Sequence, residues 1–127
     1  MSARTALVDH LTALCAVTPE LADVRVIPSI RTVGEISKPI LIVKTNSLRM
    51  IAEAPRSAPM GVFTVTLVSP HKDLDLAEDD LEARLEVLLP ALFTSGLLWE
   101  SADQAQYDEN RICYDIAVTS ILKPEGV

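Results

Sequence analysis

The chain has 127 residues, of which 49% are hydrophobic and 23% charged, and its formal net charge is −7 at pH 7. This length suits one domain with a substantial core, and this composition excludes an intrinsically disordered chain. The acidic balance argues against nonspecific nucleic-acid binding, and every apolar run falls short of the roughly 20 residues that span a bilayer.

The first predicted element is an amphipathic helix that ends near Thr18 and Pro19. Apolar residues recur there at the spacing of one helical stripe: Leu7, Val8, Leu11, Leu14 and Cys15. Asp9 and His10 interrupt the segment, so it lacks the apolar run of a signal peptide. We therefore expect a protein that is made in the cytosol and is not exported by that route.

Three strand signals follow the helix. Residues 24–27 form a short β-branched run, and residues 40–43 form a continuous apolar run typical of a strand buried on both faces. Residues 44–51 are more polar and are interpreted as an extension of that strand. Residues 62–69 alternate between apolar and polar side chains, as a half-buried strand does.

A second helix is predicted to open at Asp73 or Asp75, in an acidic stretch that the helix dipole favours. Its apolar stripe consists of Leu81, Leu85, Leu88 and Leu92. Pro90 interrupts this pattern and is expected to kink the helix or to end its regular part.

Two further strands complete the chain. Residues 97–100 indicate a short strand, and a polar turn through residues 108–110 follows it. The last strand begins at Ile112, and its apolar and polar side chains alternate. The order α-β-β-β-α-β-β predicts an α/β protein of the α+β type. We expect one domain over residues 1–127, with a mostly antiparallel or mixed sheet and both helices packed on one face.

The sequence contains no recognisable catalytic or metal-binding motif. The soft metal ligands His10, Cys15, His71 and Cys113 form no pair at metal-ligand spacing. The four glycines are widely separated, so no phosphate-binding loop is expected. We predict no enzymatic activity, no metal and no cofactor, and we interpret both cysteines as buried hydrophobic residues. Asp115, in the middle of the last strand, is the one carboxylate of interest for acid–base chemistry.

Charge is distributed unevenly along the chain. Residues 1–60 hold 7 basic and 5 acidic residues, whereas residues 61–127 hold 4 basic and 13 acidic residues. A mildly basic part and a strongly acidic part in one small domain suit head-to-tail packing of identical subunits.

The order and spacing of the elements resemble a known family. The segments that carry the resemblance are the helix end at Thr18 and Pro19 and residues 22–26, 38–43, 61–67, 96–99 and 114–119. With these elements the chain resembles the tail-terminator proteins of long-tailed phages, particularly minor tail subunits of phages that infect actinobacteria.

The resemblance implies a structural role in the virion. Proteins of this family form a hexameric ring that caps the tail tube, ends its polymerisation and provides the joint to the head or neck. The implied partners are further copies of the chain, the tail-tube protein and the head-completion (stopper) protein of the neck. Genomic DNA would pass through the lumen without sequence-specific binding, and no membrane is involved. The implied location is the tail or neck of the virion, after assembly in the host cytoplasm.

The predicted contact residues lie in two proline-bounded loops and in the strand extension. Arginine and methionine are enriched at protein interfaces, which favours these positions. They are Arg31, Lys38, Arg49, Met50, Ile51 and Arg56.

Three other functions stay open. A different neck or head-completion ring protein would bind the portal side rather than the tail tube. A small bacterial ligand-binding domain would have an apolar pocket with a few convergent polar groups. A hydrolase or transferase would need Asp115 or His71 to be functional.

Overall fold

The computed structural model describes residues 3–27, 37–49, 60–95 and 97–121. Its elements in chain order are α1 (Ala3–Val17), the 3-10 helix η1 (Pro19–Leu21), β1 (Arg25–Ile27), β2 (Ile40–Arg49), β3 (Met60–Val68), α2 (Leu74–Thr94), β4 (Leu98–Gln106) and β5 (Ile112–Ile121). The predicted order of helices and strands is confirmed, with η1 as an additional single turn.

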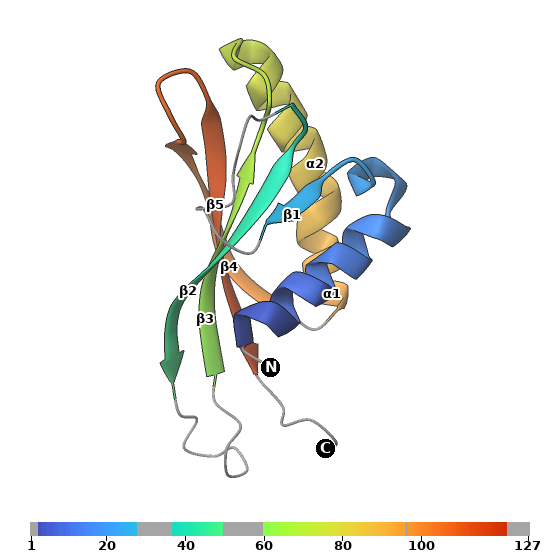
Figure 1. Cartoon of the computed structure of the whole chain (residues 1–127), viewed down its shortest axis with the longest axis vertical. Coiled ribbons are helices and arrows are strands. Elements are labelled where there is room, and N and C mark those ends of the chain that lie inside the picture. The colour runs from blue at the N-terminus through green and yellow to red at the C-terminus, as the bar shows by residue number, and fades with distance from the viewer. Residues whose placement is uncertain (1–2, 28–36, 50–59, 96, 122–127) are drawn as a thin grey trace.

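The strands form one mixed sheet in the order β1-β2-β3-β5-β4. β1 and β2 are parallel, and the other three pairs are antiparallel. Figure 1 shows α1 and α2 on the same side of this sheet, and β2 and β3 reach beyond the helices at the lower end of the view. The predicted α+β architecture, with both helices on one face, is therefore confirmed.

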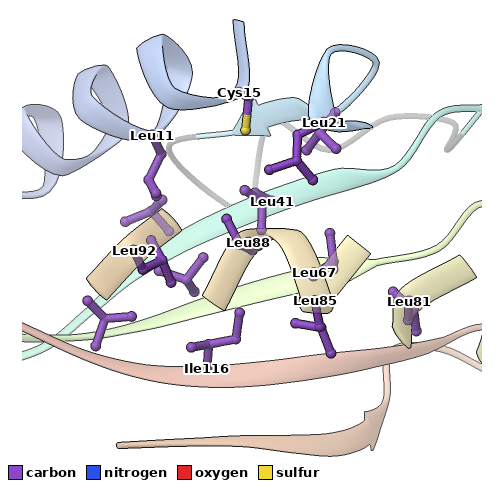
Figure 2. Packing of buried hydrophobic residues seen from close by; sticks show 14 of the residues in the cluster. Leu11, Cys15, Leu21, Leu41, Leu67, Leu81, Leu85, Leu88, Leu92 and Ile116 are labelled. Atoms are coloured by element: carbon purple, nitrogen blue, oxygen red, sulfur yellow. The ribbon is translucent and has the colours of Figure 1, made fainter. Parts of the chain in front are cut away.

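The main core lies between the helices and the sheet (Figure 2). The predicted stripe of α2 is buried in full, since Leu81, Leu85, Leu88 and Leu92 all face the core. From the sheet side, β3 contributes Phe63, Val65 and Leu67, and these three are completely buried. The inward-facing side chains of β3, which alternate along the strand, therefore pack in the same core as the buried stripe of α2.

The opposite face of the sheet carries a smaller apolar cluster. It consists of Ile27, Ile40, Ile42, Val68 and Cys113, with Ala105 and Tyr107 packed against it. Residues 40–43 are buried on both faces of the sheet, which confirms the interpretation of that run. The predicted extension of this strand is confirmed as far as Arg49, whereas residues 50 and 51 lie outside the described residues.

Of the two effects predicted for Pro90, a kink or an end of the regular helix, the second is wrong. α2 continues through Pro90 to Thr94. Pro90 is exposed, so its ring does not enter the core, and its missing N–H deprives the Glu86 carbonyl of the usual helical donor. The helix begins where predicted, because Asp73 is its N-cap and accepts hydrogen bonds from the amides of Asp75 and Leu76 at 3.0 and 3.3 Å.

The fourth strand is longer than predicted. The apolar run suggested residues 97–100, but β4 extends to Gln106. Residues after Trp99 are mostly polar because β4 is at the edge of the sheet and only part of its surface meets the core.

Candidate functional site

An open apolar groove runs between α2 and β4. Its volume is about 600 Å³, and it is lined by Glu82, Leu85, Glu86, Leu89, Pro90, Phe93 and Trp99. The six lining residues of α2 recur at three- and four-residue spacing and thus form a second stripe, which shares only Leu85 with the buried one. Phe93 is 69% exposed and Trp99 37% exposed, so two large aromatic side chains offer apolar surface to a partner.

β4 places Trp99 in the groove through its pairing with β5. Trp99 lies opposite Val118, whose side chain is in the main core, so both residues are on the helix-covered face. The register then shifts between Trp99 and Ser101, which leaves Glu100 as the extra residue of a bulge. β4 pairs only with β5 in the sheet, so the groove lies beside an edge strand.

The groove has an acidic rim. Glu82 and Glu86 line it, and Glu100 is exposed in the adjacent bulge. Arg84 is the only basic residue in the whole of α2 and β4. Its guanidinium is engaged elsewhere, so it does not neutralise the groove.

Arg84 instead ties α2 to the segment that precedes β1. It donates to both carboxylate oxygens of Asp23, at 2.7 and 2.9 Å, and to Asp80 at 2.9 Å. It also donates to the Glu20 carbonyl at 3.1 Å. The hydrogen bonds from Arg84 hold the pKa of Asp23 below its usual value, and the positive charges of Arg84 and Lys38 lower it further.

Positive charge gathers at the other edge of the sheet. Arg25 is exposed in β1, and Lys38 is exposed just before β2. The two positions are close because the Arg25 amide donates to the Pro39 carbonyl at 2.9 Å. Since β1 and β4 are the first and last strands of the sheet, the basic edge and the acidic groove lie at opposite ends of it.

The structure describes only part of the predicted contact set. Lys38 is exposed and belongs to the basic edge. Arg49 is the last residue of β2 and is paired with Met60 of β3. The other four predicted residues lie outside the described residues: Arg31, Met50, Ile51 and Arg56.

Sequence reasoning missed the groove. Leu89 and Phe93 do not fit the buried stripe of α2, and this misfit was the available signal. One helical stripe accounts for Leu81, Leu85, Leu88 and Leu92, so the leucine pattern alone does not predict a second stripe. Trp99 lies in a predicted strand, but nothing in the pattern of that strand indicates that it packs beside α2.

The residues considered for chemistry lie apart from one another. His71 is exposed before α2, and its backbone amide donates to the Ser69 hydroxyl at 3.2 Å. Asp115 is on the opposite face of the sheet and accepts a hydrogen bond from the Thr66 hydroxyl at 2.7 Å. Among the described residues, no three His, Cys, Asp or Glu side chains are grouped closely enough to hold a metal ion.

A second, polar pocket of about 410 Å³ lies near the start of α2 and the turn between β4 and β5. It includes Lys72, Glu78, Gln104 and Arg111, and the Gln104 amide donates to Glu78 at 3.3 Å. Arg111 is paired with Asp108 at 3.1 Å. The interactions of Gln104 with Glu78 and of Arg111 with Asp108 hold this turn together, while the buried Nε of Arg111 has no hydrogen-bond partner among the described residues.

No family model matches the chain, and no curated protein matches it. In the described part of the chain, no helix has both the length and the apolar character needed to cross a membrane.

Proposed function

We propose that the protein is a structural subunit of a long-tailed phage, which forms a ring on the end of the tail tube. The ring ends polymerisation of the tube and provides the joint to the neck, where the stopper protein binds. In this role the chain would be a component of the virion, and the genomic DNA would pass through the lumen of the ring.

The observation that carries this proposal is the exposed apolar groove between α2 and β4. Two aromatic side chains and an acidic rim beside an edge strand form a contact surface of the kind that subunit interfaces use. The element order that underlies the resemblance to tail terminators is also present in the fold. A surface for assembly, rather than a centre for catalysis, is therefore the function that these features support best.

A small-molecule site is the second candidate, since a volume of about 600 Å³ is within the range of ligand pockets. The polar side chains in the groove are two glutamates, and both are on its rim. This candidate predicts that a small cationic or apolar metabolite raises the melting temperature of the isolated protein.

The test is direct imaging of assembly. The purified chain is examined by native mass measurement and negative-stain microscopy, alone and with the tail-tube protein of the same phage. We expect six-fold rings, or tubes of limited length that are capped at one end, whereas tube protein alone should grow to mixed lengths. A monomer or dimer that leaves the tubes uncapped would contradict the proposal, and binding to the portal side instead would indicate another neck protein.

A further inference from the structure

We propose that the acidic groove between α2 and β4 is occupied by the basic β1 edge of a second copy of this chain. The contact joins Glu82 and Glu86 of one copy to Arg25 and Lys38 of the next. The inference deepens the proposed function and depends on it only for closure of the copies into a ring.

Charge complementarity selects the second copy as the occupant. Glu82 and Glu86 line the groove and Glu100 is exposed in the adjacent bulge, whereas the single arginine of α2 and β4 is paired with Asp23 and Asp80. The β1 edge presents Arg25 and Lys38, and Asp23 beside them is already paired with Arg84. Opposite charges on two separate surfaces of one molecule attract copies of that molecule to each other, and they set the orientation of the contact.

The groove offers more than charge to an incoming basic side chain. Pro90 has no N–H, so the carbonyl of Glu86 lacks its normal helical donor on the groove side of α2. A lysine or arginine can donate to this carbonyl while its aliphatic stem covers Leu89 and Phe93. Trp99 provides an aromatic face at which a guanidinium gains cation–π attraction.

The placement of the two surfaces determines the type of assembly. They lie at opposite ends of the sheet, so each copy uses a different surface toward each neighbour. Such a contact is heterologous, and its repetition produces either a closed ring or an open filament. A two-fold dimer in which one patch meets its own copy does not join the groove to the β1 edge.

The test exchanges charges between the two surfaces. One variant carries Glu82→Lys with Glu86→Lys, and the other carries Arg25→Glu with Lys38→Glu. Each variant alone places like charges across the contact, so we expect self-association at least about tenfold weaker than in the wild type. When the two variants are mixed, every contact again joins opposite charges, so association should return.

Sedimentation velocity measures the association, and Trp99, the only tryptophan of the chain, reports it independently. Covering this side chain should shift its emission to shorter wavelength in the wild type and in the mixture. The matched control, Asp9→Lys with Glu109→Lys, reverses two exposed charges away from both surfaces and should associate like the wild type. Circular dichroism verifies that each variant is folded.

Three results would overturn the inference: a wild type that stays monomeric at every concentration, a mixture no better than its parts, or a control as impaired as the variants. Failure of the proposed function looks different. Rings that cap tubes but ignore the charge exchange would refute this contact alone. Charge-dependent association without any effect on tubes would refute the terminator role alone.

Discussion

Arg84 is the residue at which α2, η1 and the approach to β1 are held together. Its side chain is 15% exposed, and it donates to two carboxylates and one carbonyl from three places in the chain. Because Asp23 receives both of its hydrogen bonds in a two-pronged arrangement, the geometry is specific as well as attractive. The same interaction fixes the basic edge relative to α2.

We therefore expect Arg84→Ala to lower the free energy of unfolding by about 2 kcal/mol at pH 7, because charged hydrogen bonds from a partly buried group are lost. The pKa of Asp23 is lowered in the folded state, so its contribution is complete above the usual value of 3.8. It is lost as the pH falls through the folded pKa. The difference between wild type and variant should shrink in acid.

Urea denaturation at several pH values between neutral and strongly acidic measures this difference. Lys72→Ala, which removes an exposed cation, should change stability by less than about 0.5 kcal/mol. If the difference in free energy of unfolding between the wild type and Arg84→Ala stayed constant across the acid range, Asp23 would not be the partner through which Arg84 stabilises the fold.

Helix α2 contributes to both the core and the groove. One stripe forms the core, and the stripe beside it forms the groove. Pro90 belongs to the second stripe, where it removes a hydrogen bond from the helix but leaves the core untouched. α2 is thus less stable than the same helix with alanine at position 90 would be, and the missing hydrogen bond is on its groove side.

Replacement of Pro90 by alanine should therefore stabilise the protein. We expect Pro90→Ala to raise the free energy of unfolding by about 1–3 kcal/mol, since it restores the bond to Glu86 and removes the ring from a helical position. Chemical denaturation checks the value. Phe93→Ala, an exposed change in the same groove, is the control and should stay within about 0.5 kcal/mol of the wild type. A lower free energy of unfolding for Pro90→Ala than for the wild type would contradict this prediction and would mean that the proline ring stabilises the helix.

The elements differ in how well the sequence predicts them, and burial explains the difference. β3 and α2 each have one buried face, so their patterns have clear periods of two and of three to four residues. β4 lacks such a pattern after Trp99, because all of its later side chains are exposed or only half-buried. Leu89 and Phe93 indicate the α2 side of the groove, but the groove as a whole is not predictable, since α2 and β4 form it together and their packing is not encoded in either segment alone.

For the molecule as a whole, the two thiols report on both faces of the sheet. Cys15 is buried in the main core, and Cys113 belongs to the smaller cluster on the opposite face. Burial raises the pKa of Cys15, and burial together with the charge of Asp115 raises the pKa of Cys113 to about 11. Both groups are thus protonated at neutral pH and poorly reactive.

We expect both thiols to react with a thiol reagent only when the fold opens, at rates about 100-fold or more below those of the unfolded chain. Mass spectrometry after timed labelling at neutral pH measures each site separately. Val17→Cys supplies the control, because position 17 is 78% exposed and should be labelled at once. Labelling of Cys113 as fast as this control would show that the second face of the sheet opens without global unfolding.

The bulge at Glu100 has a consequence for the behaviour of the protein in a crowded cell. β4 presents nine residues of outer edge, which is a template for chance stacking of strands and for amyloid-like growth. The bulge interrupts that edge, and the charges of Glu100 and Asp103 disfavour pairing with a strand of another molecule. In the proposed assembly, recognition therefore passes through side chains of the adjacent groove and not through this backbone edge.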